Sequence, residues 1–350
     1  MDSWSDGVMG ERVRFSNAPV LQHSNPVTFA MTEKTQESGL TRELKLISGL
    51  KVKCSEPMAR YTSMKIGGPA DYFIEVETEH ALQNLLALLK RHDSAFYLLG
   101  NGSNVLISDR GIRGAVLRLA GEFKRAQWCE EGPTVWLRVG AAYAVTQLVR
   151  EAARRGYSGL EFAEGIPGTV GGALVMNAGA YGSEIEGVVE SVEGVTARGE
   201  AIRLARAEMT FTYRDSHLPA GMVVTQVAMC LRKEDAVRVE SKIQELVRRR
   251  KSSQPSGHPN SGSMFRNPLG DFAGRLIEAA GLKGKRLGQS QISERHANFI
   301  VNLGGAKAEN VRELMELARS EVKRQFGVEL VAEIRLVGEW PPLRSRASCN

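Results

Sequence analysis

The sequence predicts a soluble protein of the mixed α+β or α/β class with more than one domain. From Tyr72 onward, short β-type runs alternate with amphipathic helical segments, which is the pattern of mixed folds. The 350 residues are 42% hydrophobic and 25% charged, as is usual for soluble globular proteins. At about 100–200 residues per domain, this length allows two or three domains, each with its own core.

The first 50 residues are predicted to be a disordered extension outside the folded domains. They mix Ser, Asn, Thr, Glu and Lys with few periodic apolar positions, so they bury too little apolar surface to fold. They also lack the continuous apolar stretch of a secretory signal, which predicts a cytoplasmic protein. The longest uncharged run, residues 165–182, contains six glycines and is predicted to be poorly helical, so no membrane span is expected.

Two folded regions are predicted after this extension, at residues 51–233 and 234–340. The first contains the β-type runs YFIEV, AFYLL, NVLIS, AVLRL and VWLRV and helices at 79–92 and 143–155. A helix at 234–251 with a basic C-terminal end marks the boundary between the regions. The second region continues with a helix at 271–280, the run NFIVN, a helix at 307–326, the strand ELVAEIRLVG and a tail at 341–350.

The loop GNGSN, residues 100–104, is the first candidate ligand-binding segment. A dinucleotide-binding loop of the Rossmann type must open a helix, but the following residues VLISDRGIRGAVLRL predict strand, turn and strand. Glycines interleaved with Ser and Asn can still direct backbone N–H groups at a phosphate. A plain β-turn is the alternative for this loop.

The second candidate is the glycine-rich segment GIPGTVGGALVMNAGAYG, residues 165–182. Glycines allow a backbone to approach a flat ligand closely. Because glycines destabilise regular elements, six of them in one segment indicate a role such as this. Tight packing without a ligand is the alternative.

Three further residues are candidates for chemistry. Arg214 follows the strand-like MTFT and is expected at a strand end, while Glu333 has apolar neighbours on its own strand face, which would raise its pKa. Ser263 lies in the turn-rich HPNSGSMFRNP without a nucleophile-elbow pattern. Considered alone, Arg214 could instead form a surface ion pair, and Glu333 could lie on a solvated edge with Arg335 as its partner. Ser263 could be a structural turn residue.

Charge and cysteine content narrow the classes of partner. The net charge of +6 favours anionic partners, and RRRK at 248–251 raises a nucleic-acid-binding module as an alternative function. No stacked-aromatic basic motif supports it, so no nucleic-acid partner is expected. The four cysteines are scattered without a C-x-x-C pair, which predicts neither a metal site nor a disulfide framework.

Several motifs together resemble the UDP-N-acetylenolpyruvoylglucosamine reductase family, over about residues 55 to 340. In chain order they are RYTSMKIGGPADYF, LLGNGSNVLISDRGIRGAVLRL, EFAEGIPGTVGGALVMNAGAYGSEI, YRDSHLP, QPSGHPNSGSMFRNP, AGRLIEAAGLKGKRLGQSQISERHANFIVN and EIRLVG. The resemblance implies an FAD-binding fold of the vanillyl-alcohol-oxidase type with two subdomains, divided near residue 120, and a C-terminal substrate domain at 234–340. The single helix after Arg232 is similar to the family's short form.

The resemblance also assigns roles to residues. The cofactor FAD would be held by Gly100, Asn101, Gly102, Ser103, Asn104, Gly165, Ile166, Pro167, Gly168, Thr169, Gly172, Asn177, Gly179 and Ala180. Hydride from NADPH would pass through FAD to UDP-N-acetylglucosamine enolpyruvate, with Arg214 and Glu333 stabilising the enolate and Ser263 donating a proton. The UDP substrate would be held by Tyr213, Lys251, Arg266 and Asn267. A monomer is expected, and another FAD-dependent oxidoreductase of the same fold is the alternative function.

Overall fold

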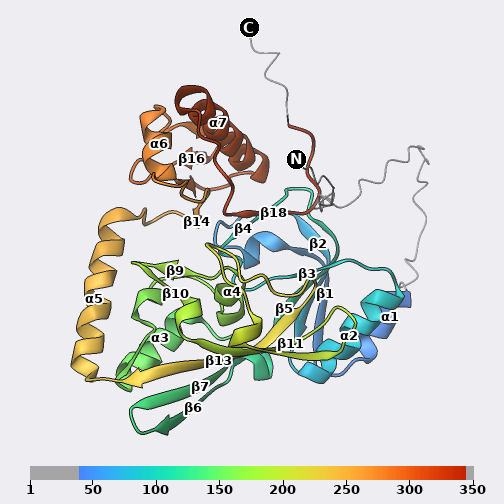
Figure 1. Cartoon of the computed structure of the whole chain (residues 1–350). Coiled ribbons are helices and arrows are strands. Elements are labelled where there is room, and N and C mark those ends of the chain that lie inside the picture. The colour runs from blue at the N-terminus through green and yellow to red at the C-terminus, as the bar shows by residue number, and fades with distance from the viewer. Residues whose placement is uncertain (1–38, 344–350) are drawn as a thin grey trace, which may run out of the picture. The chain divides into compact units, whose positions relative to one another are not determined.

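A computed structural model describes residues 39–343 and shows the predicted combination of helices and mixed sheets (Figure 1). Every helix predicted within this range has a counterpart, and so has every predicted β-type run except MTFT at 209–212, although several boundaries differ. No helix within 39–343 is long and apolar enough to cross a membrane.

The first sheet has the strand order β1-β2-β5-β3 and is covered by two helices. The strands are β1 (Leu50–Pro57), β2 (Pro69–Val76), β3 (Phe96–Leu98) and β5 (Ile112–Leu119), and the helices are α1 (Gly39–Leu46) and α2 (Glu79–Arg91). The β1–β2 pair is antiparallel, whereas β2 and β3 both run parallel to β5. Thr78 begins α2 by accepting a hydrogen bond from the backbone N–H of Ala81.

The prediction of a disordered extension over residues 1–50 is wrong for the last part of that range, which is folded. Residues 39–46 form α1, which buries Leu40 and Leu44 in the core shared with α2, and Glu43 pairs with Arg91 at 2.6 Å. An eight-residue helix spans little more than two turns, so its apolar period is too short to stand out in the sequence. Residues 1–38, and most of the predicted tail, lie outside the described residues.

The second sheet is antiparallel, with the strand order β12-β11-β13-β7-β6. Its strands are β6 (Ala126–Glu131), β7 (Thr134–Gly140), β11 (Val189–Val195), β12 (Ala201–Ala205) and β13 (Val223–Lys233), and the short β8 (Tyr157–Ser158) also pairs with β13. The helices α3 (Val145–Arg154) and α4 (Val170–Val175) join the apolar core that this sheet shares with the first sheet. The two sheets therefore share one core and form the region to which the family resemblance assigns FAD, here called the FAD-type region.

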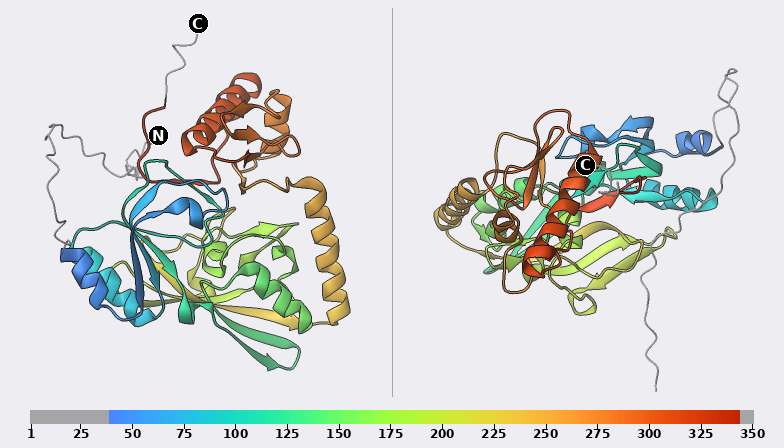
Figure 2. Two further views of the ribbon diagram at one scale, coloured as in Figure 1. Left: turned by 180° about the vertical axis from the view of Figure 1, so that it is seen from behind. Right: turned by 90° about the horizontal axis from the view of Figure 1, so that it is seen from above.

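The helix α5 (Ala236–Ser253) runs along one side of this region to the C-terminal domain (Figures 1 and 2). That domain has a four-stranded sheet and two helices around its own apolar core. The elements are β14 (Asn260–Ser263), β15 (Arg286–Leu287), β16 (Ser290–Ile292), β17 (Phe299–Asn302), α6 (Ala273–Ala279) and α7 (Ala308–Phe326).

The chain then returns to the FAD-type region through β18 (Arg335–Val337), which pairs in parallel with β4 (Val105–Ile107). The predicted ten-residue strand at 329–338 is therefore mostly irregular, and its predicted alternation of faces fails. Leu330 and Ile334 are buried, but Ala332 and Leu336, which would share their face in a regular strand, are exposed. Pairing with β4 is a contact between residues more than 200 positions apart, which local alternation cannot reveal.

Candidate active site

A cavity of about 860 Å³ is lined by segments of both regions. These segments are the loop after β3, the glycine-rich segment, the C-terminal end of α5, β14 and the residues that precede β18. Five basic side chains line it, against the single carboxylate of Glu333: Arg118, Lys124, Arg214, Arg250 and Arg335. Such a cavity suits an anionic ligand of considerable size.

All five residues of the loop GNGSN line this cavity. None of their backbone N–H groups donates a hydrogen bond to another residue in the described part of the chain. Gly102 has a φ of +61°, and a Cβ there would lie 2.2 Å from the backbone oxygen of Tyr61. The loop is thus a compact turn with free donors directed by a glycine, which is the arrangement of a phosphate-binding nest.

The glycine-rich segment lines the cavity next to this loop, and the Ser103 hydroxyl donates to the backbone oxygen of Pro167. Its residues Ile166, Pro167, Gly168, Thr169, Gly172, Gly179 and Ala180 line the cavity. Contrary to the prediction of poor helicity, residues 170–175 form α4, because the side chain of Thr169 caps its N-terminus through the N–H of Gly172 at 3.2 Å.

Two residues of the same segment, Gly165 and Asn177, do not line the cavity. A Cβ at Gly165 would lie 2.9 Å from Cδ of Arg250, so this glycine makes room for that side chain. Asn177 is fully buried and donates to Glu184 at 2.7 Å and to the backbone oxygen of Thr212 at 3.2 Å. Both residues therefore support residues near the cavity without lining it themselves.

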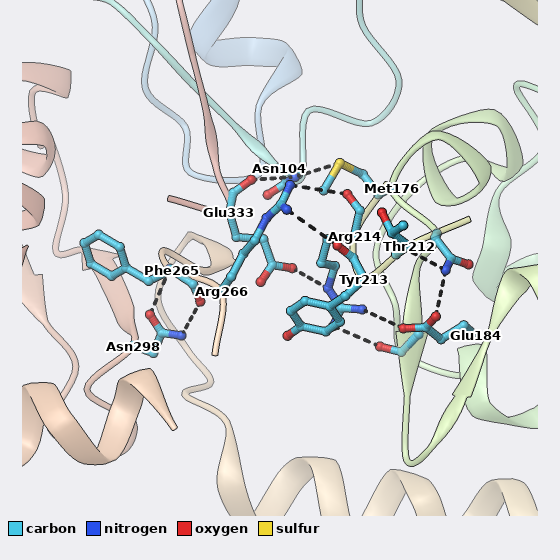
Figure 3. A network of polar contacts seen from close by, with 12 residues as sticks. Asn104, Met176, Glu184, Thr212, Tyr213, Arg214, Phe265, Arg266, Asn298 and Glu333 are labelled. Carbon is cyan, nitrogen blue, oxygen red and sulfur yellow. Dashed lines mark hydrogen bonds and ion pairs between the residues drawn. The ribbon is translucent and has the colours of Figure 1, made fainter. Parts of the chain in front are cut away.

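Arg214 lies in a tight turn rather than at a strand end. The residues predicted as the strand MTFT make only an isolated bridge between Thr212 and Asp215, and Arg214 has a φ of +64°. Its Nε donates to Oε1 of Glu333 at 2.9 Å, and its guanidinium lies 4.7 Å from the ring centre of Tyr213. The remaining nitrogens approach Glu184 at 3.7 Å and the backbone oxygen of Gly179 at 3.3 Å (Figure 3).

Glu333 is a largely buried carboxylate, with 17% of its side chain exposed. Burial raises its pKa, and the nearby charges of Arg214 and Arg266 oppose that rise. The alternative of a solvated edge with Arg335 as partner is wrong, because the partner is Arg214. A hydrogen bond from Asn104 to the backbone oxygen of Glu333, at 3.2 Å, joins this residue to the GNGSN loop.

Ser263 is the last residue of β14, where it pairs with Phe299, although the sequence predicts a turn there. Its side chain lines the cavity, and its hydroxyl makes no hydrogen bond within residues 39–343. His258, five residues earlier and in principle able to act as a base, makes no hydrogen bond to Ser263 in this range either. Three segments far apart in the chain therefore bring Arg214, Ser263 and Glu333 to one cavity.

The four predicted substrate-binding residues lie outside the cavity lining. Tyr213 packs on Arg214, Asn267 accepts from the N–H of Ala273 at 3.1 Å at the start of α6, and Lys251 is exposed. Arg266 points at the turn that carries Arg214, with its guanidinium 3.5 and 3.4 Å from the backbone oxygens of Tyr213 and Arg214. Sequence motifs alone could not show which way these side chains point.

Arg250 lines the cavity, whereas the sequence distinguishes it in no way from the rest of the basic cluster RRRK at 248–251. It donates to Gln254 at 3.0 Å and to the backbone oxygen of Glu164 at 3.4 Å, and burial lowers its pKa. Among four consecutive basic residues at the end of a helix, only a fraction can face inward. The position of α5 against the glycine-rich segment decides which one does.

The fold and the cavity define an FAD-binding oxidoreductase. Residues 70–205 match the family model of an FAD binding domain, and residues 254–337 match that of the C-terminal domain of UDP-N-acetylenolpyruvoylglucosamine reductase. The chain belongs to the UDP-N-acetylenolpyruvoylglucosamine reductase family. The predicted family, the enzyme class, the FAD cofactor and the fold class are thereby confirmed.

Relatives of known name match most of the chain. UDP-N-acetylenolpyruvoylglucosamine reductase 2 of Symbiobacterium thermophilum is 48% identical over 83% of this chain and 94% of its own length. The reductase of Caldanaerobacter subterraneus is 42% identical over 83% of this chain and 94% of its own. The crystal structure of the reductase from Thermus caldophilus has 39% identity and a TM-score of 0.71, covering 82% of this chain and 99% of that one.

Proposed function

We propose that this enzyme reduces UDP-N-acetylglucosamine enolpyruvate to UDP-N-acetylmuramate with NADPH, in peptidoglycan synthesis. The observation that carries the proposal is the convergence of Arg214, Ser263 and Glu333 on the cavity that both glycine-rich loops line. The names of its relatives, which cover four-fifths of the chain, supply the substrate.

The loop residues would hold FAD. The free N–H groups of residues 100–104 suit its pyrophosphate, and the glycines of the second segment leave space for a flat ring system. When bound, FAD would accept hydride from NADPH and deliver it to the vinyl carbon farther from the substrate carboxylate. Arg118 and Lys124 add positive charge on the same cavity.

Arg214, Glu333 and Ser263 would then stabilise the negative charge that develops on the substrate and supply the proton. Adding hydride to one vinyl carbon places negative charge on the carboxylate side, and the guanidinium of Arg214 would stabilise it. Glu333 would take part as a protonated or proton-sharing acid, which its raised pKa favours. The hydroxyl of Ser263 would give its proton to the carbon next to the carboxylate and recover a proton from solvent.

The test uses FAD-loaded enzyme mixed with NADPH and the enolpyruvyl substrate. We expect NADPH oxidation that depends on the substrate, and no stimulation by UDP-N-acetylglucosamine, which lacks the enolpyruvyl group. NADPH oxidation that ignores the enolpyruvyl substrate would overturn the assignment. Turnover of another acid or alcohol in its place would favour a different oxidoreductase of this fold.

A further inference from the structure

Arg266 is a half-buried cation beside the candidate active site, and it is not among the residues that line the cavity. Its backbone is fixed in the C-terminal domain, because its N–H donates to the oxygen of Val331 at 2.9 Å. The preceding Phe265 is buried and bonded in both directions to the side chain of Asn298, at 3.0 and 2.8 Å. The side chain of Arg266 therefore starts from a rigid base.

From this base the guanidinium reaches the turn that carries Arg214. Its two terminal nitrogens approach the consecutive backbone oxygens of Tyr213 and Arg214, at 3.5 and 3.4 Å (Figure 3). Within residues 39–343, no other donor reaches either of these oxygens. The planar fork of an arginine presents two N–H donors in fixed geometry to two neighbouring acceptors, whereas the ammonium of a lysine has no such fixed geometry.

The backbone conformation of this turn is unfavourable and must be stabilised by its surroundings. Arg214 has a φ of +64°, and a non-glycine residue in the left-handed region costs roughly 1 kcal/mol or more, so the surroundings must impose it. The flanks of the turn are held by the Thr212–Asp215 bridge and by Asn177. The two oxygens at its tip, which set the direction of the Arg214 side chain, are left to Arg266.

We propose that Arg266 is a positioning residue, which clamps the backbone of the Tyr213–Arg214 turn and so aims Arg214 at Glu333. This inference rests on the proposed function and replaces the expectation that Arg266 holds the UDP part of the substrate. The C-terminal domain thereby contributes to the geometry of a catalytic arginine that belongs to the FAD-type region.

Two variants separate the clamp from a phosphate contact. Arg266→Met removes the fork and the charge, and Arg266→Lys keeps the charge but loses the fixed geometry of the fork. The matched control is Arg275→Met on α6, an exposed arginine of the same domain that pairs with Asp271. Flavin content and thermal unfolding are measured first, and the lysine variant serves if the methionine variant does not fold.

The two half-reactions are then followed by rapid mixing. For Arg266→Met, we expect reoxidation of the flavin by saturating substrate to slow by roughly ten- to a hundredfold, since a misplaced catalytic group costs that much. Reduction of the flavin by NADPH and the substrate dissociation constant stay within about twofold, and Arg266→Lys is intermediate in rate. A weaker substrate affinity with normal reoxidation at saturation, or no change at all, would overturn the proposal.

The pH profile of reoxidation is a readout that loss of packing alone would not move. The charges that face Glu333 are Arg214, held also by Glu184, and Arg266. Removing the Arg266 charge raises the pKa of Glu333 further, so the profile shifts to higher pH in Arg266→Met and not in Arg266→Lys. An unshifted profile in both variants contradicts the proposal.

A crystal structure of Arg266→Met separates this inference from the reductase assignment. If the wild-type enzyme ignores the enolpyruvyl substrate, the proposed function fails, and the clamp is judged by geometry alone. We expect the Tyr213–Arg214 turn to relax and the contact between Arg214 and Glu333 to open. An unchanged turn would overturn the clamp even in an active enzyme.

Discussion

The FAD cradle and the Arg214–Glu333 pair are built in opposite ways. The cradle consists of two contiguous glycine-rich stretches whose backbone N–H groups and small residues make the surface. The pair joins side chains 119 positions apart, and each of the two is held by several other segments. The proposed cofactor cradle is thus encoded locally, whereas the proposed catalytic pair depends on long-range packing, so substitutions should affect the two functions separately.

The largest expected effect is on the proton donor. Ser263→Ala should slow reoxidation of the flavin by substrate by about 10²–10⁴-fold, the usual contribution of a positioned acid, and leave reduction by NADPH intact. Stopped-flow absorbance of the flavin measures both steps, with the exposed Ser256→Ala as control. Equal loss of both half-reactions would mean that Ser263 shapes the cofactor site instead.

The next prediction concerns the backbone of the cradle. Gly102→Ala should lower the free energy of unfolding by about 3 kcal/mol and yield protein poor in FAD, because a Cβ would meet the backbone of Tyr61 at 2.2 Å with φ at +61°. Gly187→Ala is the matched control, since nothing lies within 4 Å of its Cβ and its φ is not positive. Flavin content per protein and thermal unfolding report the result, and normal FAD retention in Gly102→Ala would refute the cradle's dependence on this turn.

A smaller effect should distinguish two neighbouring cations of α5. Arg250→Met is expected to weaken FAD binding by about tenfold through the loss of one charge-assisted contact, whereas exposed Lys251→Met should change ligand affinities less than about twofold. Titrations of apoenzyme with FAD and of holoenzyme with substrate measure both. A large loss of substrate affinity in Lys251→Met would instead support its predicted role at the UDP phosphates.

The smallest expected effect is on the pH dependence of the free energy of unfolding. Burial raises the folded pKa of Glu333 above the unfolded value of about 4.3, so the folded state keeps a proton that the unfolded state loses. The free energy of unfolding should therefore fall as pH rises from the unfolded pKa through the folded one, and Glu333→Gln should flatten this slope.

The exposed Glu329 is the control, because its pKa is shifted in the opposite direction from that of Glu333. Its pKa is lowered by Lys323, so its contribution is present above the unfolded pKa and is lost as pH falls through the folded pKa. Chemical denaturation at several pH values compares Glu333→Gln with Glu329→Gln. Slopes that change in the same direction in both variants would show that Glu333 is not desolvated as the structure indicates.

Much of the fold, and the two loops that line the candidate cofactor site, could be predicted from the sequence because the signals are local. Helices such as α2 and α7 have the 3.6-residue period and cover several turns. The strand, turn and strand that follow GNGSN exclude a Rossmann loop, and seven colinear motifs identify the family. Each of these depends on residues within one short stretch.

Only the tertiary structure decided how the catalytic side chains meet and what holds them. The left-handed turn at Arg214, the short parallel pairing of β18 with β4, and the direction of Arg266 all depend on contacts between distant segments. The sequence determined only the residue types: an arginine, a glutamate and a serine that no hydrolase pattern surrounds. Their positions follow from packing of the C-terminal domain against the FAD-type region, because burial and long-range hydrogen bonds override local propensity.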